Sequence, residues 1–144
     1  MLKLKAYRID KDLPLPQYAT AGSVGFDLLT RQEITIKPQT IALVPTNLIL
    51  ELPPGFVLLV TARSSTPRRK KLSVPHGVGI IDQDFCGPQD EIQIQVYNFS
   101  TQTVKVERGE KIAQALVTPC ARVQFTEVPA ITRATRGGFG STDT

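Results

Sequence analysis

Glu91-Ile92-Gln93-Ile94-Gln95-Val96-Tyr97 decides the fold, because polar and apolar side chains alternate through it without a break. That period of two places the apolar side chains on one face of a β-strand and the polar ones on the other. Two further runs, residues 41–44 and 56–60, have the length and β-branched content of strands. No segment keeps a helical period for long, so we predict an all-β chain.

Turn residues divide the chain at intervals of roughly ten residues, which is the spacing of a β-sandwich or β-barrel. They are Pro38, Pro45, Pro53-Pro54-Gly55, Pro75, Gly87-Pro88 and Arg108-Gly109. The 144 residues fit one domain and show no internal repeat. Only the last dozen residues, rich in glycine, differ in kind and predict a segment that does not pack in the core.

Composition narrows the class of protein. The sequence has no run of eighteen apolar residues and no charged-then-apolar leader, so we expect a soluble cytoplasmic protein without a membrane segment. Cys86 and Cys120 lack metal-ligand spacing, which favours reduced thiols. The net charge of +4 favours anionic partners, but five of the seventeen basic residues lie between Arg63 and Lys71. That is a local patch, and we expect no nucleic-acid partner.

Several kinds of active site are excluded. His76 is the only histidine and has no serine nucleophile beside it, which argues against a hydrolytic triad. A zinc site of cysteine and histidine is equally unsupported, and the phosphate-binding sequence GxxxxGK[ST] is absent. If a metal takes part, its ligands are oxygens, which indicates magnesium.

The stretch Gly77-Val78-Gly79-Ile80-Ile81-Asp82-Gln83-Asp84-Phe85 delivers two carboxylates from a short apolar strand. On a strand, Asp82 and Asp84 point to the same side about 7 Å apart, where like charges repel. A cation, a basic partner or a polar substrate would explain them, and a solvated strand end is the alternative.

Four other segments carry polar groups beside flexible backbone. Residues 62–65, Ala-Arg-Ser-Ser, offer a guanidinium and two hydroxyls after a strand, which is suited to phosphate. Residues 21–28 and 108–115 have the pattern of a turn before a strand, and a plain turn is the simpler interpretation of each. The tail 133–144 carries an aromatic ring, two arginines and two adjacent hydroxyls, although a frayed terminus would have the same composition.

Taken in order, AGSVGFDL, ARSS, GIIDQDF, RGEKIAQ and RGGFGST resemble the five motifs of the dUTPase family, and they span residues 21–142. The resemblance implies a jelly-roll-like β-barrel forming a homotrimer, with active sites shared between subunits. It implies a barrel domain at residues 1–132 and a flexible arm at 133–144 that closes over a site. The implied reaction is hydrolysis of dUTP to dUMP and pyrophosphate with Mg2+ on the triphosphate, which keeps uracil out of DNA and supplies dUMP for thymidylate synthesis.

The resemblance also assigns residues. Asp82 would be the general base that activates water, Phe85 would lie under the deoxyribose, and Asp27 would hold a water on the metal. Backbone groups of a hairpin at residues 77–81 would recognise uracil, and the other substrate contacts would come from residues 63–65, from Gln114 and from the tail. These substrate-binding positions are Arg63, Ser64, Ser65, Gly77, Gly79, Ile80, Ile81, Gln114, Arg136, Phe139, Gly140, Ser141 and Thr142.

The sequence departs from the family at three places. Ala134 stands where an arginine normally precedes the tail phenylalanine, so either Arg133 or Arg136 would reach the γ-phosphate, and we favour Arg136. Ser65-Thr66-Pro67 replaces the small apolar residues that usually follow the Arg-Ser pair, and the four charged residues 68–71 that come next are interpreted as a solvated loop. Cys86 follows Phe85, and nothing in the sequence gives it a role.

Two other functions remain open. The related dCTP deaminases need a glutamate two residues before a Tyr-Asn pair, and here Gln95 stands before Tyr97-Asn98. An amide cannot shuttle the proton. A non-catalytic dUTPase-like regulator could instead bind a protein or nucleic acid through residues 68–71, but the intact Asp82 and tail argue against it.

Overall fold

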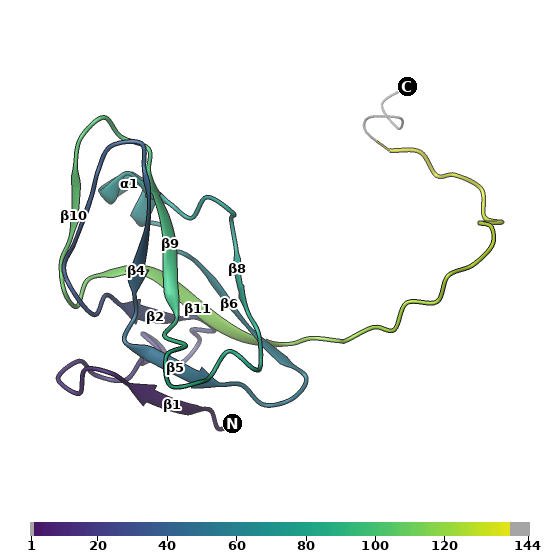
Figure 1. Ribbon diagram of the computed structural model, residues 1–144, viewed down its shortest axis with the longest axis horizontal. Helices are drawn as coiled ribbons and strands as arrows, with labels where there is room; N and C mark the ends of the chain where they lie inside the picture. Colours follow the sequence, from purple (N-terminus) through teal and green to yellow (C-terminus); the bar gives the residue numbers. More distant parts are fainter. Residues whose placement is uncertain (1, 139–144) are drawn as a thin grey trace.

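The computed structural model describes residues 2–138. Its strands are β1 (Lys5–Arg8), β2 (Phe26–Leu29), β3 (Ile34–Ile36), β4 (Ile41–Pro45), β5 (Leu48–Glu51), β6 (Phe56–Ala62), β7 (Leu72–Ser73), β8 (Gly79–Ile81), β9 (Gln93–Asn98), β10 (Val104–Val106) and β11 (Lys111–Pro119). One short helix, α1 (Thr66–Lys70), interrupts the strands of this described part. The predicted all-β fold is confirmed (Figure 1).

The prediction of a loop at residues 68–71 is wrong, because three of these residues belong to α1. Pro67 supplies the helical φ at the start of the helix, and Lys71 ends it in the left-handed conformation with φ of 57°. The buried Thr66 hydroxyl donates to the Ile112 carbonyl (2.7 Å) and ties the helix to β11. The charged residues 68–70 therefore belong to a helix of a single turn, and their charges alone did not indicate it.

The largest sheet has the order β2-β11-β6-β8, with every pair antiparallel. β6 lies at its centre: β11 pairs with it from Ala62 to Phe56, and β8 pairs opposite Leu58 to Val60. The Ala62 end of β6 therefore lies beside the start of β11, which pairs with β2 on its other edge, while the other end of β6 lies near the end of β8. The two ends carry the two parts of the candidate site.

A second sheet, β4-β9-β7, packs its apolar face on the core. In β9, Ile94 and Val96 are buried while Gln93 is exposed, as the alternation predicted. The pairs β1–β5 and β3–β10 complete the fold, so within residues 2–138 the ladders form four sheets and no closed ring. The core side chains that these sheets enclose include Leu28, Leu58, Leu72, Ile92 and Ile112.

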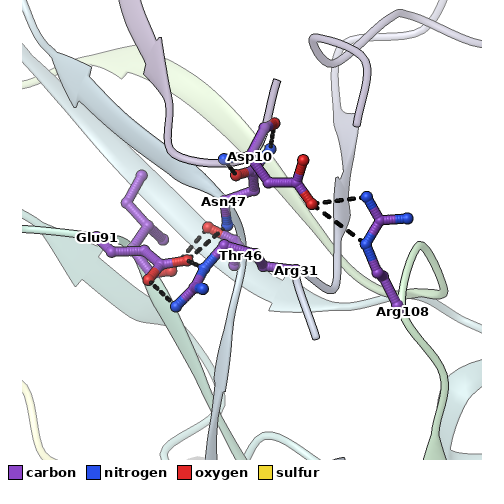
Figure 2. Close-up of polar contacts among 7 residues, drawn as sticks. Asp10, Arg31, Thr46, Asn47, Glu91 and Arg108 are labelled. Atoms are coloured by element: carbon purple, nitrogen blue, oxygen red, sulfur yellow. Dashed lines mark hydrogen bonds and ion pairs between the residues drawn. The ribbon is translucent and has the colours of Figure 1, made fainter. Parts of the chain in front are cut away.

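A buried polar network joins the segment after β2 and the segment before β9 to the β4–β5 turn (Figure 2). The Glu91 carboxylate, 9% exposed, accepts two hydrogen bonds from Arg31 (2.8 and 2.9 Å) and a third from the Asn47 backbone N–H (2.8 Å). These bonds compensate for the removal of the charge from water, and Glu91 raises the pKa of Arg31.

The same network reaches the turn before β11. The Asn47 side chain accepts from the Asp10 N–H (2.6 Å) and donates to the Asp10 carbonyl (2.9 Å). The Asp10 carboxylate pairs with Arg108 (2.6 Å), and Figure 2 shows both guanidinium contacts. The turn that contains Arg108 is thus held by side chains far away in the sequence, and this fixes where β11 begins.

Candidate active site

Five of the predicted site residues meet in one pocket, which we call the Ser64 pocket. It has a volume of about 190 Å³ and is lined by Gln17, Ala19, Ser23, Gly25, Asp27, Arg63, Ser64, Ser65 and Gln114. Strand register explains the meeting, because Gln114 on β11 lies opposite Asp27 on β2 and opposite Thr61 on β6. Three segments that are far apart in the sequence therefore present their polar groups together.

Ion pairs fix the arrangement of the Ser64 pocket. The Asp27 carboxylate, 19% exposed, accepts from Arg63 Nε at 2.9 Å and lies 3.4 Å from Lys111 Nζ. Two cations thus face one carboxylate, although only Arg63 of the two lines the pocket, and the net positive charge around Asp27 favours an anion. Sequence reasoning did not assign Lys111 a role, although it lies within the RGEKIAQ motif.

The pocket also offers hydrogen-bond donors that are free within residues 2–138. The backbone N–H groups of Ser64 and Ser65 make no hydrogen bond to the described chain. Ser64 is exposed and Ser65 is half-buried, so these N–H groups and the two hydroxyls can serve a ligand. Donors of this kind beside a guanidinium match the oxygens of a phosphate.

Asp82 lies at the other end of β6. β8 ends at Ile81, and the following turn closes with a hydrogen bond from the Phe85 N–H to the Asp82 carbonyl (3.3 Å). Residues 82–85, which we call the Asp82 turn, are therefore not strand, and the expected strand face carrying both Asp82 and Asp84 is absent. Both aspartates are exposed, and neither forms an ion pair with the described residues.

A cavity of about 380 Å³ adjoins the Asp82 turn, lined by Phe56, Val57, Asp82, Gln83, Asp84, Cys120 and Arg122. Gln83 anchors the turn by donating to the Phe56 carbonyl (3.1 Å). Cys120 and Arg122 arrive here because β11 ends beside the start of β6, a long-range pairing that no local sequence signal reveals. Cys86 donates to the Gln83 carbonyl (3.7 Å) and does not line this cavity.

The predicted base-reading hairpin precedes the Asp82 turn. Gly77 has φ of +77°, which favours glycine, and its N–H donates to the Val74 carbonyl (2.9 Å). Gly79 faces the protein, and Ile80 is 68% exposed. β8 is an edge strand, so its free edge presents backbone donors and acceptors that can pair with a flat polar ring.

The two halves of the candidate site are far apart within one chain. Leu58, which pairs with Ile81, and Ala62, which adjoins Arg63, are four residues apart on β6, or about 13 Å at strand spacing. Asp82 and Ser64 lie beyond these two ends. Asp82 therefore cannot approach, even through one water, a ligand atom held by the Ser64 pocket of the same chain.

The chain beyond β11 leaves the folded body (Figure 1). Residues 121–138 are exposed and have no helix or strand, and Phe125 is 92% exposed. Arg133 and Arg136 lie on this segment. The predicted tail contacts Phe139, Gly140, Ser141 and Thr142 lie outside the described residues.

The donor set limits how a metal could bind. Within residues 2–138 no three histidine, cysteine, aspartate or glutamate side chains are grouped to hold a metal ion. Asp27 supplies a single carboxylate in the Ser64 pocket, and Mg2+ is commonly held by one or two carboxylates together with substrate phosphates.

No helix of the described part is long and apolar enough to cross a membrane.

Comparison with known proteins places the chain. The dUTPase family model matches residues 11–143. A deoxyuridine 5'-triphosphate nucleotidohydrolase of Dictyoglomus turgidum is 38% identical over 99% of both chains, and one of Helicobacter pylori strain P12 is 36% identical over 98% of this chain and 97% of its own. The crystal structure of dUTPase from Streptococcus mutans superimposes with a TM-score of 0.77 at 33% identity, covering 85% of this chain and 98% of that one. A Staphylococcus bacteriophage 80alpha dUTPase, at 20% identity over 99% of both chains, has the same fold with a TM-score of 0.84. This chain belongs to the dUTPase family.

Proposed function

We propose that the protein hydrolyses dUTP to dUMP and pyrophosphate. The observation that carries the proposal is the Ser64 pocket, in which a guanidinium, two hydroxyls, free N–H groups and an amide converge. Such donors suit a chain of phosphates better than any neutral ligand. Membership of the dUTPase family, whose relatives are named for this reaction, supports the substrate.

In the proposed mechanism, Arg63, Ser64, Ser65 and Gln114 hold the phosphates. Asp82 takes a proton from the attacking water, whose oxygen forms a bond to the α-phosphorus. The bond between that phosphorus and the bridging oxygen breaks, and pyrophosphate leaves with the electron pair. The exposed Asp82 carboxylate can accept this proton once substrate binding brings the α-phosphorus near it.

Mg2+ suits this chemistry, because a hard cation on the triphosphate neutralises charge that develops on the leaving oxygens. Asp27 would hold a water of the metal ion, although it also pairs with Arg63 and Lys111. Most ligands would come from the substrate, in agreement with the single carboxylate of the Ser64 pocket. A phage phi11 dUTPase with this fold has been described with a structural Mg(II) ion.

The nucleoside would bind along the hairpin and the Asp82 turn. The free edge of β8, from Gly79 to Ile81, would pair with the polar edge of uracil. Cytosine presents donors and acceptors in the reverse order, so the same backbone would reject it. Phe85, 38% exposed, offers the ring that would lie under the deoxyribose and leave no space for a ribose 2'-hydroxyl.

We infer that the active protein is a homotrimer with sites shared between chains. The separation of Asp82 from the Ser64 pocket supports sharing, because one chain cannot complete the site alone. The segment after β11 supports it too, since a lone chain leaves Val123, Phe125 and Ile131 at least 70% exposed. The arm would then reach another chain and contribute Arg136, Phe139, Gly140, Ser141 and Thr142.

The start of the arm is a separate point. β11 ends at Pro119, so chain without helix or strand begins before residue 133, where the family resemblance implied the boundary of the arm. We keep 133–144 as the part that closes over a site, with 120–132 as a connection along another subunit.

A cytoplasmic location stays a prediction.

One assay decides among the candidate functions. Purified protein is incubated with dUTP, dCTP, dTTP and UTP in Mg2+, and pyrophosphate and ammonia are measured separately. We expect pyrophosphate from dUTP alone and ammonia from none. Ammonia from dCTP would indicate a deaminase despite Gln95, and nucleotide binding without any product would indicate a regulator.

A further inference from the structure

A second polar cavity lies beside the Ser64 pocket, between α1 and the turn before β11. We call it the helix–turn pocket. Its volume is about 340 Å³, and it is lined by Arg63, Ser65, Thr66, Arg69, Lys70, Gly109, Glu110 and Lys111. The two pockets share Arg63 and Ser65, so they are neighbours separated by these two residues.

Positive charge dominates the helix–turn pocket, with four cationic side chains facing one carboxylate. That carboxylate, Glu110, is already paired with Lys70 at 2.8 Å. Arg69 is exposed, and its guanidinium makes no ion pair or hydrogen bond within residues 2–138. Its planar donor fork is therefore free to bind an anion through two parallel bonds.

The walls of the helix–turn pocket are fixed before any ligand arrives. On one side, the Thr66 hydroxyl anchors α1 to Ile112. On the other, Gly109 turns the chain at φ of +80°, and its N–H donates to the Thr30 carbonyl (2.7 Å). The Glu110 carboxylate also accepts from the Glu107 N–H (2.9 Å), which closes the turn. A ligand therefore orders little more than the Arg69 side chain, and binding loses little entropy.

We propose that the helix–turn pocket is an accessory site for a free oligophosphate, specifically inorganic pyrophosphate. This rests on the proposed function only for the source of the ligand, since dUTP hydrolysis would release pyrophosphate next door. Pyrophosphate is compact, highly charged and rich in acceptors, which matches several donors around a small cavity. Arg63 and Ser65 line both pockets, so a leaving group released in one would meet donors that also face the other.

The site has a functional consequence. Pyrophosphate can occupy the helix–turn pocket while a nucleotide fills the Ser64 pocket, so the two ligands do not exclude each other. Their negative charges lie close together and repel, so each weakens the binding of the other. Accumulated pyrophosphate would then weaken nucleotide binding without displacing it completely.

Calorimetry with pyrophosphate tests the proposal on full-length protein at fixed Mg2+, with the Ser64 pocket filled by the imido analogue dUpNHpp. We expect one pyrophosphate per chain in wild type, and Arg69→Gln should weaken it about tenfold, the loss of a charge-assisted hydrogen bond. Arg68→Gln is the matched control: it removes the same charge from the next residue of α1, which does not line the pocket. The affinity of Arg68→Gln for pyrophosphate should stay within about twofold of the wild-type affinity.

Orthophosphate is titrated in parallel and should bind at least tenfold more weakly, because it spans fewer donors. Three results would overturn the proposal: no pyrophosphate binding once dUpNHpp is present, equal weakening by Arg69→Gln and Arg68→Gln, or equal affinity for orthophosphate. If the protein neither binds dUpNHpp nor hydrolyses dUTP, the pyrophosphate titration is run without the analogue. Pyrophosphate binding that still depends on Arg69 would then refute the proposed function and leave the accessory site standing.

Discussion

The two ends of β6 carry the same kinds of polar group but hold them differently. At the Ser64 pocket, Asp27, Arg63 and Lys111 are tied into ion pairs across three strands. At the Asp82 turn, two exposed carboxylates have no such partner within residues 2–138, and only Gln83 anchors the turn. One chain thus builds a finished anion pocket, whereas the carboxylates of the Asp82 turn are left open for groups from elsewhere.

This difference indicates a division of labour. Under the proposed function, the preorganised charges of the Ser64 pocket would bind the phosphates without having to rearrange, which would give affinity. Under the proposed function, the exposed Asp82 carboxylate would act only once substrate and groups from elsewhere complete the site.

Asp82→Asn should lower kcat at least about a hundredfold, the usual contribution of a positioned base, and leave nucleotide affinity within about tenfold. The amide keeps the size of the side chain and one acceptor but cannot take the proton. Steady-state kinetics with dUTP and titration with dUpNHpp measure the two quantities. Asp84→Asn removes the neighbouring charge of the same turn and should cost less than tenfold. A tenth of wild-type kcat remaining in Asp82→Asn would show that another group is the base.

Mixing two impaired variants tests whether one site draws on two chains. Asp82→Asn and Arg63→Gln damage opposite ends of β6, and a shared site can combine an intact Asp82 from one chain with an intact Arg63 from another. After full exchange of subunits, about a quarter of the sites regain both residues. Activity should therefore rise well above either variant alone, with exchange verified by mass spectrometry. No recovery after proven exchange would place both residues of each site in a single chain.

Asp27→Asn should have a smaller effect, near the Ser64 pocket. The change removes the carboxylate that pairs with Arg63 and Lys111, and the one that would hold a water on Mg2+. We expect kcat/KM for dUTP to fall about tenfold and the Mg2+ concentration for half-maximal rate to rise. Glu33→Gln, a charge loss outside the pocket, is the control. An unchanged Mg2+ dependence would mean that Asp27 only orders Arg63 and Lys111.

Much of the fold could be predicted from the sequence because its signals are local. Alternation in β9 and the apolar run of β6 locate strands without knowledge of their partners. The short helix α1 was not predicted because a single turn made of a threonine, a proline and three charged residues has no periodicity to detect. The division of the strands into four sheets depends on long-range pairing, which no local pattern contains.

The candidate site could be predicted residue by residue only through ordered motifs, and these do not give neighbours. Lys111 lies inside a motif but shows its pairing with Asp27 only when β11 meets β2. Cys120 and Arg122 carry no local signal, and they reach the Asp82 turn through the far end of the same strand pairing. The net charge indicated an anionic ligand, whereas the register of the paired strands determines which side chains lie together at the candidate site.

The smallest predicted effect concerns the turn before β11, where Arg108 pairs with the Asp10 carboxylate. The side-chain hydrogen bond from Arg108, with help from the Asp12 N–H, lowers the pKa of Asp10 below its ordinary value. A lowered folded-state pKa stabilises the protein fully above the unfolded pKa of about 4, and this contribution is lost as pH falls through the folded-state pKa. Arg108→Gln removes most of the lowering, so the variant should melt slightly below wild type at pH 7.

That difference in melting temperature should shrink as the pH falls below about 4, because wild type then loses the same contribution. Melting curves by circular dichroism between pH 7 and pH 3 measure it. Lys105→Gln is the matched control at a distance: Lys105 lowers the pKa of Glu33, so its removal should give a similar pH dependence that adds to the first. A difference that stays constant at every pH would show that Arg108 holds the turn by packing rather than by its charge on Asp10.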